Sequence, residues 1–161
     1  AFSGDYDTAF KEFTIAAEEG LSLAQYNLGI LYFTGQGVEQ NFDEAFEWTK
    51  RAAEQGHLNA QFNLASLYLD GQGTQVSVFD GVNWFTQAAK NGHANSAYTL
   101  AKMHQEGDFV DSDLVLAHAW AAQSEINEHP EANSLKKEIA QDLSAEEIRQ
   151  ARRIFAAWQI E

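Results

Sequence analysis

The sequence predicts an all-α protein built from stacked antiparallel helix pairs and closed by a C-terminal helix. Three observations support this prediction. The chain has a 36-residue repeat, each unit has apolar residues at helical spacing, and each apolar stripe has a capping residue before it and a glycine after it. The chain has 161 residues, no Cys and one Pro. Packing of a single core must therefore hold the fold together, without disulfides or thiolate metal sites.

The repeat is visible in several residue types at once. The series at a step of 36 are Gly20, Gly56 and Gly92; Gly35, Gly71 and Gly107; Leu28, Leu64 and Leu100; Trp48, Trp84 and Trp120; and the alanine pairs 16–17, 52–53 and 88–89. One helix pair cannot bury its apolar stripe alone, so the units must stack on one another. The repeats are expected at about 5–37, 41–73 and 77–109, with a partial fourth at 113–126.

The first helix of each pair begins after a capping residue. This position holds Asp5, Asn41, Ser77 and Asp113, each of which has a side-chain oxygen that can accept a hydrogen bond from a free backbone amide. In the second repeat the apolar stripe starts at Phe42 and includes Trp48. The helix is expected to end at the glycine series Gly20, Gly56 and Gly92, because glycine readily adopts the left-handed conformation that closes a helix.

The second helix of each pair follows that glycine and is expected to stop at a glycine turn. In the second repeat it carries Ala60, Leu64 and Tyr68, and it ends at residues 71–73, which match residues 35–37. His57 and His93 occupy equivalent positions before this helix and are predicted to be surface loop residues.

Residues 127–161 depart from the repeat and are expected to form C-terminal capping helices. Pro130 opens a polar helix to about Gln141, and Ser144 with Glu147 forms a capping box for a last helix through Trp158. Leu143, Ile148, Ile154, Phe155 and Trp158 form one apolar stripe, which is predicted to cover the last repeat.

The charge argues against nucleic acid as a partner. The formal net charge is −14, and residues 1–135 hold 19 acidic and 5 basic residues, whereas residues 136–161 hold 5 of each. Such a surface repels nucleic acid and anionic lipid. There is no apolar run of 18 residues, so no membrane span is predicted. The chain starts at Ala1 without a visible signal peptide, which suggests a processed end or a boundary.

The runs 45–57, 60–64 and 71–73 resemble the Sel1-like repeat, and the resemblance covers roughly residues 4–126. Tetratricopeptide repeats are the second choice, because they run at 34 residues without the glycine loop. The resemblance implies a right-handed superhelical solenoid of antiparallel helix pairs, and a monomeric scaffold or adaptor without cofactors that binds other proteins in its concave groove. The tail from Leu143 to Trp158 also resembles the closing helix of bacterial members, often exported ones, which implies a bacterial protein that is periplasmic or exported rather than cytoplasmic.

Enzyme and metal chemistry have weak support in the sequence. Ser134 and Lys137 fit the serine-x-x-lysine pattern of penicillin-recognising enzymes, but the companion motifs are missing. An exported hydrolase acting on cell-wall or β-lactam substrates therefore remains the alternative, beside a purely structural spacer. The five histidines include no i, i+4 pair, so no metal site is predicted.

The expected binding surface is polar and acidic. A partner peptide is predicted to contact residues outside the buried stripes of the first helices and two asparagines that recur on the second helices. A peptide with a basic segment is favoured as the partner. These residues are Glu12, Asn27, Glu47, Lys50, Asn63, Asn83 and Gln87. The alternative contact surface is the face with Arg149, Arg152 and Arg153.

Overall fold

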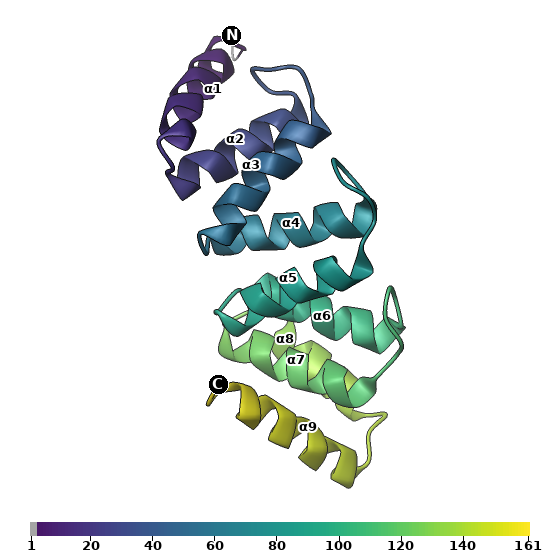
Figure 1. Ribbon diagram of the computed structural model, residues 1–161. Helices are drawn as coiled ribbons and strands as arrows, with labels where there is room; N and C mark the ends of the chain where they lie inside the picture. The colour runs from purple at the N-terminus through teal and green to yellow at the C-terminus, as the bar shows by residue number, and fades with distance from the viewer. Residues whose placement is uncertain (1–2) are drawn as a thin grey trace. The chain divides into compact units, whose positions relative to one another are not determined.

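The computed structural model describes residues 3–161, and these residues form nine α-helices without a strand (Figure 1). The helices are α1 (Ser3–Glu18), α2 (Ser22–Thr34), α3 (Phe42–Glu54), α4 (Leu58–Asp70), α5 (Val78–Lys90), α6 (Ala94–Glu106), α7 (Leu114–Ile126), α8 (Ala132–Ala140) and α9 (Ala145–Trp158). The prediction of an all-α fold of consecutive helix pairs is confirmed.

The chain divides into two compact units, Ala1–Trp84 and Phe85–Glu161, with the division inside α5. In the N-terminal unit, α2 packs against both α1 and α3, and α3 packs against α4. In the C-terminal unit, α7 packs against α6, α8 and α9. The stacking expected from the repeat is therefore present within each unit.

Side-chain caps start three of the four first helices as predicted. The Asn41 side chain accepts a hydrogen bond from the Glu44 amide at 3.1 Å, and Ser77 and Asp113 cap α5 and α7 in the same way. The prediction for Asp5 is wrong, because α1 begins at Ser3 and includes Asp5. Asp5 lies in the first turn of α1, where its carboxylate suits the positive end of the helix dipole.

Buried side chains of successive helices form the core of the N-terminal unit. Leu64 and Ala60 of α4 pack with Phe46 of α3, and the half-buried Trp84 packs against the same cluster. A second cluster joins Leu28 of α2 to Ala17 of α1. The alanines are fully buried and let the helix backbones approach one another, as the paired alanines in the sequence indicate.

The turns after the first helices all contain a residue with positive φ. The first three are glycines, Gly20, Gly56 and Gly92, with φ of 94°, 90° and 103°. The fourth repeat places Glu128 at the same position, and its φ is 68°. A side chain makes this conformation unfavourable by about 1–2 kcal/mol, so Glu128 is held in a strained backbone conformation by the surrounding turn.

Replacing Glu128 with Gly is therefore expected to raise the free energy of unfolding by about 1 kcal/mol, after the greater flexibility of glycine in the unfolded chain is subtracted. Urea denaturation of the two proteins measures this difference. The matched control is Glu138→Gly inside α8, which is expected to lower stability by about 1 kcal/mol because φ is ordinary there. A loss of stability in both variants would contradict the strain at Glu128.

His57 and His93 are helix caps, which the sequence prediction of surface loop residues missed. The Nδ1 atom of His57 accepts a hydrogen bond from the Ala60 amide at 3.1 Å, and Nδ1 of His93 accepts one from the Ser96 amide at 3.2 Å. The His57 ring also stacks on Tyr26 of the preceding repeat, with ring centroids 4.5 Å apart. Each histidine must be neutral at Nδ1 to accept this bond.

Stability is expected to fall as the pH drops below about 6.5, the ordinary histidine pKa. Burial lowers the pKa of His57 and of His93, so the unfolded chain binds more protons than the folded chain in this range. The double variant His57→Asn/His93→Asn keeps a capping oxygen, and its melting temperature should change less between pH 8 and pH 5. His118, whose pKa is also lowered first by burial, remains in the variant and preserves part of the slope. Identical slopes in the two proteins would contradict this assignment.

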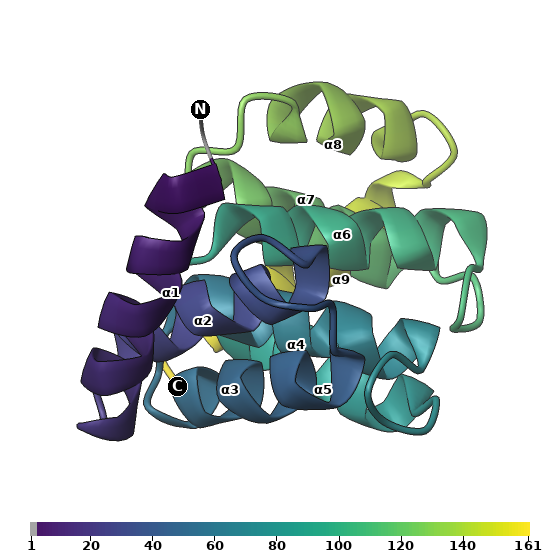
Figure 2. The ribbon, with the colours of Figure 1, turned by 90° about the horizontal axis from the view of Figure 1, so that it is seen from above.

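The C-terminal helices α8 and α9 both pack on α7. Trp158 of α9 stacks on Trp120 of α7 with ring centroids 4.1 Å apart, and the Gln159 amide donates to the Gln123 side chain at 2.7 Å. The predicted capping box of Ser144 and Glu147 is present at the start of α9. Figure 2 shows α8 beside α7, in agreement with their packing.

Candidate functional site

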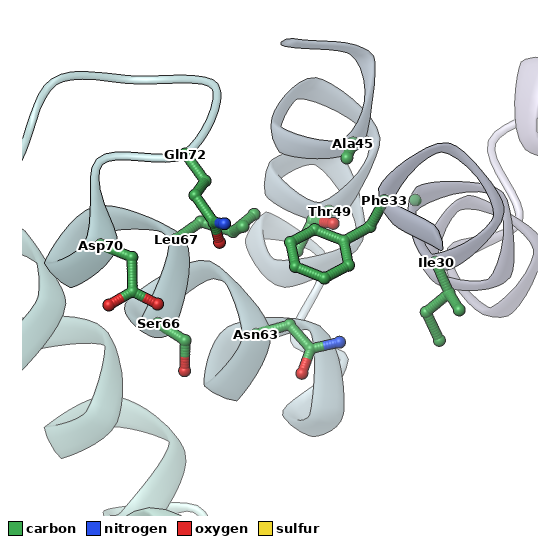
Figure 3. A pocket seen from close by; sticks show the side chains of 10 residues that line it. Ile30, Phe33, Ala45, Thr49, Asn63, Ser66, Leu67, Asp70 and Gln72 are labelled. Carbon is green, nitrogen blue, oxygen red and sulfur yellow. The ribbon is translucent and has the colours of Figure 1, made fainter. Parts of the chain in front are cut away.

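An open pocket of ≈ 180 Å³ lies in the N-terminal unit among α2, α3 and α4. The lining residues are Gly29, Ile30, Phe33, Ala45, Thr49, Asn63, Ser66, Leu67, Asp70 and Gln72. Figure 3 shows that the Phe33 ring extends from α2 toward α3 and α4, and that Gln72 reaches in from the loop after α4. The second helices of two successive repeats thus form its walls.

Gly29 explains why the floor of the pocket is closely packed. A Cβ atom at this position would lie 2.6 Å from Oγ1 of Thr49 and 3.4 Å from the Ala45 carbonyl oxygen. Only a glycine allows α2 to approach α3 this closely. Thr49 and Ala45 are consequently buried, and the space above them stays open between α2 and α4.

The α2 wall of the pocket is apolar and reaches solvent. The Phe33 side chain is 37% exposed and packs against the Phe42 ring, with centroids 5.3 Å apart. Ile30 lies one turn earlier on the same helix and is half-buried. When a ligand covers apolar surface that is open to solvent in a concave pocket, the free energy falls and binding is favoured.

The α4 wall is polar. Asn63, Ser66 and Asp70 follow one another at helical spacing and lie on one face. The Ser66 hydroxyl donates to the Phe62 carbonyl at 3.2 Å, whereas no group among residues 3–161 hydrogen-bonds the Asn63 amide. Because an amide both donates and accepts, Asn63 can pair with the N–H and the C=O of a peptide backbone.

Asn63 is the residue of the predicted binding set that lines this pocket. The others lie elsewhere: Glu12 is exposed on α1, Asn27 is half-buried on α2, Glu47 and Lys50 are on α3, and Asn83 and Gln87 are exposed on α5. Lys50 is half-buried near Tyr68, where burial raises the pKa of the phenol and the Lys50 charge opposes that rise.

Sequence reasoning did not single out Ile30, Phe33, Ser66 or Asp70. Ile30 and Ser66 are 36 residues apart and occupy one repeat position, so a comparison of outward positions on the second helices would have found both. Phe33 carries a different signal, an aromatic residue beside the glycine turn at residues 35–37.

The enzyme-like residues do not form a site of their own. Ser134 and Lys137 are both exposed on α8, and neither is among the residues that line the α2–α4 pocket or the cleft beside α7. Within residues 3–161, no group of three metal-ligating side chains could hold a metal ion. No described helix is long and apolar enough to cross a membrane.

Comparison with known proteins identifies the repeat. The family model of the Sel1 repeat matches residues 22–57, 58–93 and 94–124, each of which starts at the second helix of a pair. No curated protein matches the chain.

Solved structures with this fold come from several bacteria. A protective antigen of uropathogenic Escherichia coli with an SLR fold is 29% identical at a TM-score of 0.81, over 92% of this chain and 32% of the antigen. A Sel1 repeat protein from Oxalobacter formigenes is 29% identical at a TM-score of 0.74, over 82% of this chain and 54% of that protein.

Cysteine rich protein B of Helicobacter pylori shares the fold at 15% identity and a TM-score of 0.63, over 84% of this chain and 97% of that protein. The chain thus spans about a third of the Escherichia coli antigen and about half of the Oxalobacter protein. Proteins with Sel1 repeats generally act as scaffolds for protein interactions. With three matched repeats that together cover more than half of its residues, this chain belongs to the Sel1 repeat family.

Proposed function

We propose that this chain is a non-enzymatic adaptor that binds an extended segment of a partner protein in the pocket between α2 and α4. The observation that supports this most strongly is the pairing of exposed apolar surface at Phe33 with an unengaged amide at Asn63 across the same pocket. An extended peptide offers both an apolar side chain and a backbone that needs hydrogen-bond partners. The known role of Sel1 repeats in protein interactions agrees with this proposal.

The charge of the N-terminal unit favours a basic segment. Residues 1–84 contain 12 acidic and 3 basic residues, and Asp70 is the charged residue among those that line the pocket. Glu47 is exposed on α3 and adds to the negative potential. Lys or Arg side chains that flank an apolar residue in the partner would be attracted over about a Debye length, roughly 10 Å at 0.1 M salt.

Affinity for the partner is therefore expected to fall about tenfold between 0.1 M and 0.5 M salt, and also in Glu47→Lys, with little change in melting temperature. A crosslinking pull-down from the native organism supplies the partner, and calorimetry at the two salt concentrations measures its affinity. Asn63→Ala tests the pocket itself, and Asn95→Ala, an exposed asparagine on α6, is the matched control.

The affinity for the partner could be unchanged in all three comparisons: at 0.5 M salt, in Glu47→Lys and in Asn63→Ala. This result would place the contact outside the pocket. If the Asn63→Ala variant binds as weakly as expected but salt has no effect, the pocket stands and the basic segment is wrong. A pull-down that recovers no protein would favour a structural spacer.

The proposal includes a monomer in the bacterial periplasm. It rests on the resemblance of residues 143–158 to exported members of the family and on the bacterial source of the similar structures. Fractionation of the native organism tests the location, and sedimentation equilibrium tests the monomer.

A further inference from the structure

A second cleft lies in the C-terminal unit, where residues of α7, α8 and α9 meet. Its volume is ≈ 480 Å³, and α8 and α9 both pack against α7 beside it. The lining residues are His118, Ala122, Glu125, Ile126, Lys136, Ala151, Arg152 and Phe155. None of them belongs to the pocket of the proposed function, which lies in the other unit.

The cleft carries an unbalanced positive charge in an otherwise acidic protein. Lys136 forms an ion pair with Glu125, and the Asn133 amide also donates to Glu125 at 2.6 Å. These hydrogen bonds, from Lys136 first and from Asn133 second, hold the pKa of Glu125 below its ordinary value. Arg152 is exposed, and no carboxylate among residues 3–161 pairs with it. The lining therefore offers one guanidinium whose charge is not neutralised.

A buried histidine at the same cleft lacks a hydrogen-bond partner. His118 is only 6% exposed, and its Nδ1 atom is buried with no partner in the described chain. Burial, followed by the charges of Lys136 and Arg152, lowers the pKa of His118. Because no protein group fixes its tautomer, the neutral ring can carry its proton on Nε2 and donate it to an anion in the cleft.

Apolar side chains complete the lining. Ile126 is 57% exposed, and Phe155, Ala122 and Ala151 lie around the same space. A pocket with apolar walls and a few convergent polar groups is typical of a site for a small molecule or a chain terminus. Here the convergent groups are a guanidinium and an unpartnered imidazole, and both suit a carboxylate.

We propose that this cleft binds a carboxylate carried on an apolar group, with the carboxylate at Arg152 and His118 and the apolar group against Ile126 and Phe155. Two sources offer this chemistry: a small aliphatic acid, and the apolar C-terminal residue of a peptide. Arg152 contributes a planar pair of N–H donors that matches the two carboxylate oxygens.

The test is a titration of the full chain with octanoate and with N-acetyl-Gly-Leu, each compared with its neutral amide. Calorimetry measures affinity, and NMR follows the His118 ring. Both acids are expected to bind better than their amides, and the pKa of His118 should rise when an acid binds, because a nearby negative charge favours the imidazolium. Arg152→Glu should weaken binding at least about tenfold, whereas the matched control Arg153→Glu, an exposed arginine outside the lining, should change it less than about twofold.

Binding of octanoate alone would assign the site to a small acid, binding of the peptide acid alone would assign it to a C-terminus, and either result supports the site. Equal affinity for acids and amides, equal losses in the two arginine variants, or no binding of either acid overturns the proposal. His118→Gln provides a second check, since it should reduce affinity while the melting temperature shows whether the helices remain packed. None of these outcomes depends on the protein partner of the α2–α4 pocket.

Discussion

Replacing Gly73 with Ala is expected to lower the free energy of unfolding by about 3 kcal/mol, the sum of a left-handed backbone and a steric clash. Gly73 has a φ of +73°, and a Cβ atom there would lie 2.0 Å from the Phe42 carbonyl oxygen and 2.8 Å from the Phe46 Cβ. The turn after α4 must therefore move away from α3 to admit even a methyl group. Urea denaturation measures the loss.

Gly56→Ala is the matched control for this substitution. Gly56 has a φ of +90°, but nothing lies within 4 Å of the position of its added Cβ. Its replacement carries only the backbone cost, about 1–2 kcal/mol. Equal losses at Gly56 and Gly73 would show that the turn does not rest tightly on α3.

Truncation after Gln141 is expected to lower stability by at least about 3 kcal/mol, comparable with the loss of a buried tryptophan, and to cause self-association. The truncation removes α9 and with it the stack of Trp158 on Trp120 and the ion pair of Lys90 with Glu161. It leaves the buried Trp120 uncovered on α7. Thermal denaturation and sedimentation velocity measure the two effects.

A shorter truncation after Gln159 is the control, because it removes the exposed Ile160 and Glu161, with the surface ion pair to Lys90, but keeps Trp158. This variant should remain monomeric and melt within a few degrees of the full chain. If the chain that ends at Gln141 behaves in the same way, α9 does not act as a cap.

Repetition made the helix boundaries predictable. A single asparagine before an apolar run is weak evidence for a cap, but Asn41, Ser77 and Asp113 occur at one repeat position and all three cap a helix. Asp5 has the same residue type at the same repeat position but does not mark a helix start, because α1 begins at Ser3 and includes it.

The candidate pocket was less predictable because it depends on how two helices face each other. Periodicity distinguishes the buried stripe from the exposed side of a helix, but it does not show which exposed residues of α2 and α4 border one space. Asn63 was predicted from its recurrence, whereas Phe33 became recognisable only when its half-exposed ring was seen against Phe42. The cap function of His57 was missed for a different reason, because histidine is not among the preferred capping residues.

Site-specific photo-crosslinking tests directly whether the partner binds in the α2–α4 pocket. A photoreactive phenylalanine is placed at Phe33 in the pocket, at Ser66 on its opposite wall, and at Phe79, which is 76% exposed on α5 and lies outside the lining. Positions 33 and 66 are expected to capture the same protein, Asn63→Ala should remove both adducts, and position 79 should capture none of that protein. Capture of that protein from position 79 but from neither pocket position would show that the partner does not bind in this pocket.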